Sequence, residues 1–588
     1  MIVRSAVKRS TYVDSVTLML VQKEVRQQPG VTEAGLVVAT DANRTLLRDA
    51  GLLSPEAEAA GPDDLVISVS GTSDNVVAAA LALAEQLLTQ RRHPTAAGEY
   101  RPRTIAAARR MLPDATIAAI SVPGRFAAAV ARDVLQEGLH VFLFSDNVPL
   151  EDELALKRMA AERGRLLMGP DCGTALVGGV GLGFANKVRR GSVGIVAAAG
   201  TGLQEVSTLI HRFGGGVSQG IGTGGRDVSQ AVGGMTMLQG LAALAADPET
   251  TVLVLVAKPP HPGVAARILG AAQRAGKPVV ACFVGSRVAS RGRVVGAGTL
   301  EDAALTAVRL AVGRTGEPPP SLALPAQEAA RLAPGQRNLR GLYSGGTLCA
   351  EAQGLLRGYV GHVRSNAPLD PADATDGLAP SSGHTVLDLG GEEFTQGRLH
   401  PMIDPTLRLQ RLAQEAEDPE VGVVLLDVVL GFGADRDPAQ TLAPAIAQAR
   451  QQALAAGRYL CVIGALCGTE EDPQEYRDQQ EMLVAAGMLV ESSNARAARL
   501  AGRILAGRGA KSEERASPLL EVTPQDVDLP DAAEVVRLLH APPQVINVGL
   551  ELFAESLREQ RIPVVDLDWR PPAGGKKHLL ELLNKLEA

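Results

Sequence analysis

The chain of 588 residues is long enough for about three to five domains. Its 58 Lys and Arg against 65 Asp and Glu leave a formal net charge of −7, which argues against nucleic acid as the main partner, because a phosphate backbone requires a clustered basic excess. No apolar run reaches the ~18 residues that a membrane helix needs, no secretory signal is visible, and the five Cys form no CxxC pair. We therefore expect a cytoplasmic protein with no membrane contact, no disulfides and no metal site.

Short apolar runs alternate with amphipathic stretches and divide the chain into five segments. Residues 1–92 predict strand, helix, strand, helix, in a small N-terminal α/β domain. Residues 103–189 predict buried strands with a helix between them. Residues 190–312 and 337–508 each open with a strand, a glycine-rich turn and a helix. The last segment, 520–588, predicts strand, helix, strand.

The alternation of strands and helices is typical of βαβ units and parallel sheets. We therefore predict a multi-domain α/β fold. Because 190–312 and 337–508 share one opening pattern, we expect two doubly wound domains of one kind in tandem.

Four glycine-rich turns follow predicted strands. Ligands of open parallel sheets bind outside the carboxyl ends of the strands, where helix N-termini offer free N–H groups to anions. Any single turn could equally be only a tight turn, and none matches the Walker A or dinucleotide fingerprint. The candidate phosphate-binding residues are Gly200, Thr201 and Gly202; Gly224, Gly225 and Arg226; Gly345, Gly346 and Thr347; and Gly390 with Gly391.

Few residues are candidates for acid–base catalysis. His261 and His400 lie in loops after strand-like runs, where functional residues collect, although such a histidine can equally be an ordinary surface residue. Arg226 and Arg398 could clamp an anion or simply be solvated. Cys172 is expected to be a small buried residue rather than a nucleophile.

Two family resemblances are visible. LMGPDCGTAL, GSVGIVAAAGTGLQEVSTLI and SQGIGTGG resemble the α subunit of succinyl-CoA synthetase, and HTVLDLGGEEF with GVVLLDVVLGFG resembles the C-terminal domain of its β subunit. HPMIDPTLRLQRL and VINVGLELFAESL resemble the FdrA family, which is labelled acyl-CoA synthetase. The resemblance implies a Rossmann-like CoA-binding-type domain over 103–189. It also implies two flavodoxin-like domains, α-like over 190–312 and β-like over 337–508.

Three parts that synthetase chemistry needs are missing from the expected places. Gly296 stands where that family carries its phosphorylated histidine. Residues 95–115 contain no glycine-rich CoA loop, and the linker at 313–338 is too short for an ATP-grasp domain. CoA and ATP are therefore disfavoured, and we expect no cofactor.

The FdrA resemblance implies a carbamoyltransferase subunit of the oxamate carbamoyltransferase type, active in allantoin and purine degradation. Its ligands would be oxalurate, oxamate, phosphate and carbamoyl phosphate. On this hypothesis the turns at Gly200–Gly202 and Gly390–Gly391 face one another and hold phosphate, while Arg226 and Arg398 clamp anionic groups. His261 or His400 would transfer the proton.

Further subunits encoded nearby, in a homo- or hetero-oligomer, are also expected. Two alternatives stay open. One is an ADP-forming acyl-CoA synthetase-like protein that acts with a separate ATP-grasp partner. The other is a non-catalytic scaffold subunit.

Overall fold

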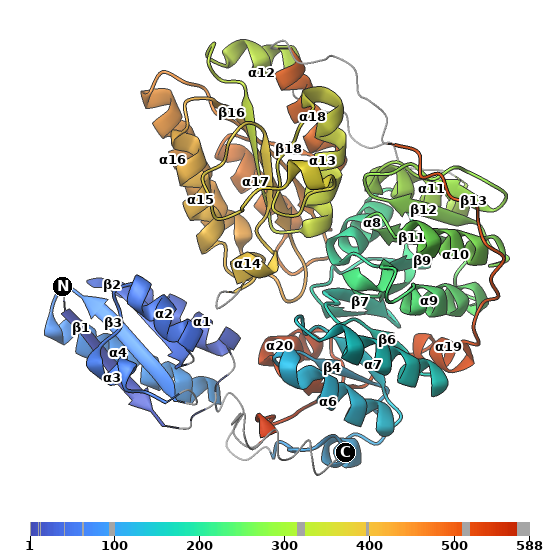
Figure 1. The fold of residues 1–588 in the computed structure, drawn as a ribbon, viewed down its shortest axis with the longest axis horizontal. Helices are drawn as coiled ribbons and strands as arrows, with labels where there is room; N and C mark the ends of the chain where they lie inside the picture. Colours follow the sequence, from blue (N-terminus) through green and yellow to red (C-terminus); the bar gives the residue numbers. More distant parts are fainter. Residues whose placement is uncertain are drawn as a thin grey trace.

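The structure, a computed structural model, describes residues 2–572 except 10, 12, 14, 40, 62, 63, 93–99, 314–323, 396–398 and 508–517. Arg398 lies outside the described residues. Within them the strands form four sheets, and Figure 1 shows the blue N-terminal domain beside the larger body of α/β units.

The N-terminal domain is a small α/β unit, as predicted. Its antiparallel sheet has the order β1-β3-β2, and the central strand β3 is buried along its whole length because both neighbours and the helices cover it. The elements are β1 (Ile2–Lys8), α1 (Ser15–Arg26), β2 (Val31–Val38), α2 (Asp41–Asp49), α3 (Pro55–Glu58), β3 (Leu65–Gly71) and α4 (Asp74–Arg92).

A second, fully parallel sheet has the order β20-β19-β4-β5-β6. Its strands come from two distant parts of the chain, since Ile546 of β19 pairs with Ala118 of β4. The segment predicted as a separate C-terminal βαβ unit thus completes the sheet of the predicted Rossmann-like segment, and Figure 1 shows red α20 beside cyan β4 and α6. The elements are α5 (Ile105–Met111), β4 (Ile117–Ile120), α6 (Gly124–Gln136), β5 (His140–Leu143), α7 (Leu150–Glu162), β6 (Leu167–Met168), α19 (Ala533–Leu539), β19 (Val545–Val548), α20 (Glu551–Glu559) and β20 (Val564–Asp566).

The third sheet has the order β13-β12-β11-β9-β10-β7-β8. Its first five strands are parallel and give the flavodoxin-like order 2-1-3-4-5, while the β7–β8 hairpin adds an antiparallel edge. The elements are β7 (Thr174–Val177), β8 (Val180–Gly183), β9 (Arg190–Ala197), α8 (Gly200–Arg212), β10 (Val217–Gly222), η1 (Gly225–Val228), α9 (Met235–Ala246), β11 (Val252–Ala257), α10 (Pro262–Gln273), β12 (Val279–Phe283), β13 (Val294–Gly296) and α11 (Leu300–Val312).

The fourth sheet, β15-β14-β16-β17-β18, is parallel and has the same 2-1-3-4-5 order, so the prediction of two doubly wound domains in tandem is confirmed. The elements are α12 (Pro325–Arg331), β14 (Asn338–Tyr343), α13 (Gly346–Val360), η2 (Pro371–Asp373), β15 (Thr385–Asp388), α14 (Glu392–Thr395), α15 (Thr406–Glu417), β16 (Val421–Val429), α16 (Pro438–Ala455), β17 (Cys461–Cys467), α17 (Tyr476–Ala485), β18 (Met488–Glu491) and α18 (Asn494–Ala506).

Two buried glutamates join the doubly wound domains in both directions. Glu351 of α13 accepts a hydrogen bond from the backbone N–H of Leu300, the first residue of α11 in the other domain, at 2.8 Å. In return, Glu205 of α8 accepts from the backbone N–H of Asn494, the first residue of α18, at 3.0 Å. The side chain of Asn494 also donates to Glu351 at 2.8 Å. Each domain therefore caps the last helix of the other.

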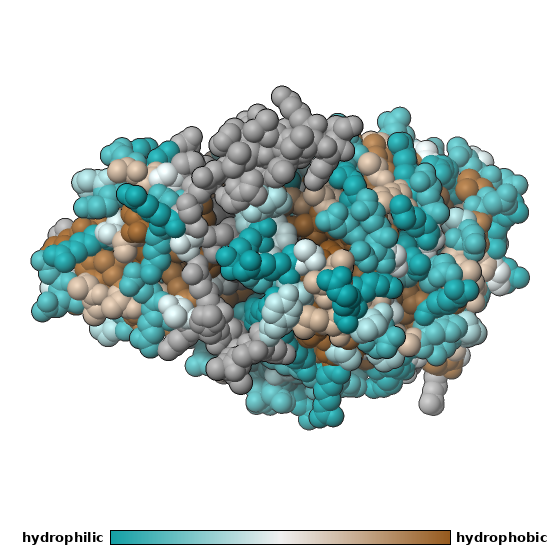
Figure 2. Space-filling view, turned by 90° about the horizontal axis from the view of Figure 1, so that it is seen from below, coloured by the Kyte–Doolittle hydropathy of each residue, from teal (hydrophilic) through white to brown (hydrophobic). Residues whose placement is uncertain are grey.

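The face of the molecule in Figure 2 is mostly hydrophilic, with apolar residues in scattered patches. Such scattered apolar exposure is normal for a folded surface. No helix among the described residues is long and apolar enough to cross a bilayer.

Candidate functional site

The first helices of the two doubly wound domains meet end to end near their N-termini. In a 2-1-3-4-5 sheet the chain order reverses between strands 1 and 3, here between β9 and β11 and between β14 and β16, and ligands bind at that point. The backbone N–H of Thr347 in α13 donates to Thr201 Oγ1 in α8 at 3.3 Å. A Cβ on Gly345 would lie 2.8 Å from Thr201 Cγ2, so this close approach requires glycine. The predicted turns at Gly200–Gly202 and Gly345–Thr347 are thus brought together.

The two turns differ in what fills them. Before α13, the Asp427 carboxylate accepts from the backbone N–H groups of Ser344 and Gly345, each at 2.8 Å, and Arg408 donates to it at 2.8 Å. Asp427 therefore occupies the place that an anion would take at that turn.

The corresponding turn before α8 is open. Leu255 pairs with Val196, four residues before α8, just as Leu426 pairs with Leu342, four residues before α13. The counterpart of Asp427 is therefore the apolar Val256, and Ala199, the residue before α8, has no side chain that could cap its first N–H groups. The α8 turn is thus open only in the sense that no carboxylate occupies it, whereas Asp427 occupies the α13 turn.

Lys258, Asp388 and His400 gather beside these turns. A Cβ built on Gly346 would lie 3.3 Å from Lys258 Nζ and 2.4 Å from Asp388 Oδ2. One built on Gly390 would lie 2.7 Å from His400 Nε2. Lys258 follows β11 of one domain, whereas Asp388 ends β15 of the other, so the cluster spans the two domains.

Burial shifts the pKa of both titratable partners, Asp388 and His400. It raises the pKa of the Asp388 carboxyl, and the nearby Lys258 ammonium opposes that rise. Burial lowers the pKa of His400 to about 4, so its imidazole is neutral at pH 7. His400 Nδ1 accepts from the backbone N–H of Met402 at 3.2 Å, which leaves the ring proton on Nε2, the atom that faces Gly390.

The Gly390–Gly391 turn does not face α8 as the predicted second half of a phosphate site. Its N–H groups are already used, because Gly390 donates to Asp388 Oδ1 at 3.1 Å and Gly391 to the Asp388 carbonyl at 3.3 Å. The following helix, α14, has only four residues and so brings little dipole. The long helix opposite α8 is α13 instead.

Three further candidates lie elsewhere. Gly224 packs on Pro170, whose carbonyl oxygen would lie 2.1 Å from a Cβ there, and Gly225 begins the short turn η1. Arg226 is held by Glu153 at 3.0 Å and by the Val148 carbonyl at 2.6 Å, and therefore is not free to clamp an anion.

His261 is exposed and acts as a helix cap. Its Nδ1 accepts from the backbone N–H of Gly263 at 3.3 Å at the start of α10, and its own N–H donates to the Val228 carbonyl at 3.1 Å. Cys172 is buried, and burial raises the pKa of its thiol to about 12, in line with a packing role.

Gly296 has no space for a side chain, so no residue that could carry a phosphoryl group fits at this position. A Cβ there would lie 1.8 Å from the carbonyl oxygen of Val288. The position that matches the phosphorylated histidine of succinyl-CoA synthetase is therefore closed to a side chain.

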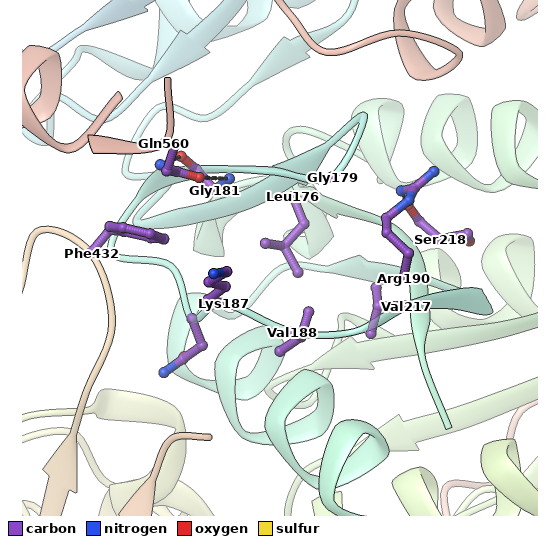
Figure 3. A pocket seen from close by; sticks show the side chains of 11 residues that line it. Leu176, Gly179, Gly181, Lys187, Val188, Arg190, Val217, Ser218, Phe432 and Gln560 are labelled. Atoms are coloured by element: carbon purple, nitrogen blue, oxygen red, sulfur yellow. Dashed lines mark hydrogen bonds between the residues drawn. The ribbon is translucent and has the colours of Figure 1, made fainter. Parts of the chain in front are cut away.

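A pocket opens where the β7–β8 hairpin, the loop carrying Phe432 and helix α20 meet, and Figure 3 shows its lining. Gln560 closes one end by bonding both the N–H and the carbonyl of Gly181, at 2.8 and 2.9 Å. Arg190 is held by the Ser218 carbonyl and by Glu249. None of the predicted site residues lines this pocket, and we assign it no ligand.

Comparison with known families gives a CoA-ligase match on the second doubly wound domain and a CoA-binding match that falls on the first, not on the predicted residues 103–189. The family described as CoA-ligase matches residues 342–504, and that described as CoA binding domain matches residues 188–285, which includes the open turn before α8. A third, described as AllF, heavy metal-associated domain, matches residues 1–103. The chain thus has the succinyl-CoA ligase-like fold of the acyl-CoA synthetase class.

The similar proteins define the family. Uncharacterized protein YahF of Escherichia coli (strain K12) is 44% identical over 500 residues, which are 84% of this chain and 97% of that protein. The chain belongs to the YahF family. Subunit alpha 2 of the ADP-forming succinate–CoA ligase of Archaeoglobus fulgidus is 30% identical over 218 residues, 34% of this chain and 74% of that subunit. The ADP-forming sulfoacetate-CoA ligase subunit SauD of Bilophila wadsworthia is 27% identical over 192 residues, 31% of this chain and 63% of SauD.

These findings overturn the predicted carbamoyltransferase. The matching domains are those of CoA ligases, and the relatives with named activities are CoA ligase subunits. That prediction depended on the FdrA resemblance, on Gly296, on the short linker at 313–338 and on the absence of a glycine-rich loop from residues 95–115. FdrA membership itself stays a prediction.

The N-terminal domain does not fit a heavy-metal site. Such metals prefer thiolates, yet residues 1–103 contain no Cys and a single His, His93, which lies outside the described residues. Across the part of the chain that the structure describes, no group of three His, Cys, Asp or Glu side chains could hold a metal ion.

We therefore expect the purified chain, titrated with Zn²⁺ or Cu⁺ against a competing chelator, to retain no metal in this domain. The measurement is metal content by mass spectrometry after gel filtration, with His93→Ala as the matched variant. One retained equivalent that His93→Ala abolishes would contradict this expectation.

Proposed function

We propose that the chain is the CoA-binding, ligase-type subunit of an acyl-CoA synthetase and acts with a separate ATP-using subunit. The observation that carries the proposal is the order of the parallel sheet β20-β19-β4-β5-β6. Numbered along the chain, this is the Rossmann order 3-2-1-4-5, with its reversal between β4 and β19. CoA would bind outside the carboxyl ends of these two strands.

The residues at that crevice suit a phosphorylated ligand. Helix α6 begins directly after β4 without a side-chain cap, and the exposed Arg125 lies in its first turn. A helix N-terminus and a guanidinium both favour the phosphates of CoA. After β19 the chain turns at Gly549, whose φ is +127° and where a Cβ would lie 2.6 Å from Ser121 Oγ. This turn beside β4 is a glycine-dependent loop, and it lies far in sequence from residues 95–115.

The interdomain cluster would handle the acyl group and phosphate. It combines the open α8 turn with a lysine, a carboxylate and a neutral imidazole. Because Gly296 leaves no place for a side-chain phosphate carrier, the phosphoryl group would reach this cluster as an acyl phosphate made by the partner subunit.

Isothermal titration of the full chain with CoA tests the proposal. We expect saturable binding to one site, weakened about tenfold by Arg125→Ala, since a charge-assisted hydrogen bond contributes about 1.5–3 kcal/mol. The matched control is Arg132→Ala on the same helix, whose side chain faces Asp152 at 3.9 Å and which should bind CoA as the wild type does. Absence of CoA binding by the wild type, or equal loss in both variants, would contradict the proposal and favour a scaffold role.

A further inference from the structure

Trp569, the only tryptophan of the chain, lies at the edge of the split Rossmann-like sheet. It follows Asp566, the last residue of β20, which lies opposite Asn547 of β19 in the parallel pairing. The Trp569 ring packs edge-on against the ring of Phe126, with the ring centroids 5.6 Å apart and an interplanar angle of 60°. Phe126 lies in the first turn of α6, the helix that follows β4. The indole therefore lies where the carboxyl ends of β20, β19 and β4 meet, beside the crevice assigned to CoA.

Only part of the indole packs into the core of this domain. Trp569 is half-buried, whereas the Phe126 side chain that it contacts is 6% exposed and belongs to the core cluster of the domain. The exposed Arg125 lies over the same phenylalanine, with its guanidinium carbon 4.7 Å from the ring centroid. A tryptophan with one part packed and another part accessible is typical of a surface that contacts a ligand or partner. The crevice thus offers an aromatic surface close to a guanidinium group.

Two further arginines lie beside Trp569 and share one carboxylate. Asp568, the preceding residue, accepts hydrogen bonds from Arg103 at 3.2 Å and from Arg570 at 3.1 Å. One carboxylate cannot neutralise two guanidinium groups, so positive charge remains next to the indole. Guanidinium groups bind phosphate bidentately, and phosphate is therefore the anion that this arrangement suits best.

The other acidic residues at this edge of the sheet are compensated within the protein. Arg101 pairs with Glu551, the first residue of α20, at 2.6 Å and with Asp566 at 3.1 Å. The side chain of Asn547 also donates to Asp566, at 2.8 Å. An arriving phosphate thus meets guanidinium charge rather than an unpaired carboxylate. A ligand that joins phosphate groups to a flat aromatic ring fits these surroundings.

We propose that Trp569 stacks on the adenine ring of CoA, with Arg103 and Arg570 beside it for the phosphate groups of the nucleotide. Nucleic-acid bases stack on aromatic side chains because every base has a π face, and nearby arginines strengthen such binding. CoA carries an adenine ring and phosphate groups in one half and the reactive thiol in the other. This inference rests on the proposed function, because it names how the same crevice would recognise its ligand.

The fluorescence of the full chain tests the proposal, because Trp569 is the only tryptophan and the signal therefore reports on this position. We expect saturable quenching by CoA and by adenosine bisphosphate, the nucleotide half of CoA, and no change with pantetheine, the other half. Isothermal titration should show CoA affinity weakened about tenfold in Trp569→Leu, which loses the stacking surface. Trp569→Phe keeps an aromatic ring and should retain most of the affinity.

The comparison of these two variants excludes a merely structural role, since leucine and phenylalanine both keep an apolar contact with Phe126. Circular dichroism shows that each variant is folded. Equal CoA affinities of folded Trp569→Leu and Trp569→Phe, or unchanged fluorescence on CoA binding, would overturn the stacking. Tighter binding of ATP than of CoA would overturn the assignment to CoA. If the wild type binds CoA by calorimetry while its fluorescence stays constant, only this inference fails; if CoA does not bind, the proposed function fails with it.

Discussion

Asp427→Ala is expected to lower the free energy of unfolding of the second doubly wound domain by about 3–5 kcal/mol, the cost of breaking a buried ion pair by removing one partner. Asp427 is 1% exposed and holds two backbone N–H groups as well as Arg408, which is itself 3% exposed. The substitution leaves a buried guanidinium without its charge partner and two N–H groups without acceptors. Urea unfolding followed by circular dichroism measures the change.

The double variant Arg408→Met with Asp427→Leu is the matched control. It removes both charges together and should recover much of the lost stability, because no buried charge is left unpaired. A single variant that unfolds like the wild type, or a double variant less stable than Asp427→Ala, would show that the pair does not hold this turn.

Loss of the Glu351 proton is expected to make the protein less stable as pH rises from about 5 to 8. Burial raises the pKa of this carboxyl from 4.5 to about 7, and Glu205 nearby adds to the rise. The folded state therefore binds the proton more tightly than the unfolded state. This contribution is fully present below pH 4.5 and is lost as pH rises through about 7, with a size of about 3 kcal/mol.

The measurement compares urea unfolding at pH 5, 6, 7 and 8 for the wild type and Glu351→Gln. The difference in unfolding free energy between the two should change by about 3 kcal/mol over this range, since the amide does not titrate. Glu481→Gln, which alters an exposed glutamate of α17, should follow the wild type at every pH. A constant difference between Glu351→Gln and the wild type would mean that Glu351 does not titrate there.

Local patterns predict much of this fold. Runs such as VLVLVA and GVVLLDV are long enough and apolar enough to identify buried parallel strands, and their glycine-rich turns mark where helices begin. The pairing of β19 with β4 could not be predicted, because it joins strands that are distant in sequence and alike in composition.

The candidate site was only partly predictable. Gly200–Gly202 and Gly345–Thr347 come together because each follows the first parallel strand of its doubly wound domain, and His400, beyond β15 and α14, lies beside Gly390. That Asp427 fills one turn, and that Arg226 is bound by Glu153, depends on tertiary contacts that no spacing reveals. Lys258 belongs to the interdomain cluster but was not predicted as a site residue. Its position directly after a buried strand was the available signal.

The split Rossmann-like sheet also affects how the chain folds during synthesis. Both doubly wound domains are inserted between β6 and β19, so strands β4, β5 and β6 emerge from the ribosome long before their neighbours β19 and β20. Until then the flank of β4 is an unpaired edge, the kind of surface that associates with other chains. The pairing of β4 with β19 joins residues far apart in sequence, so the crevice between these two strands would be assembled last, after the inserted domains have folded.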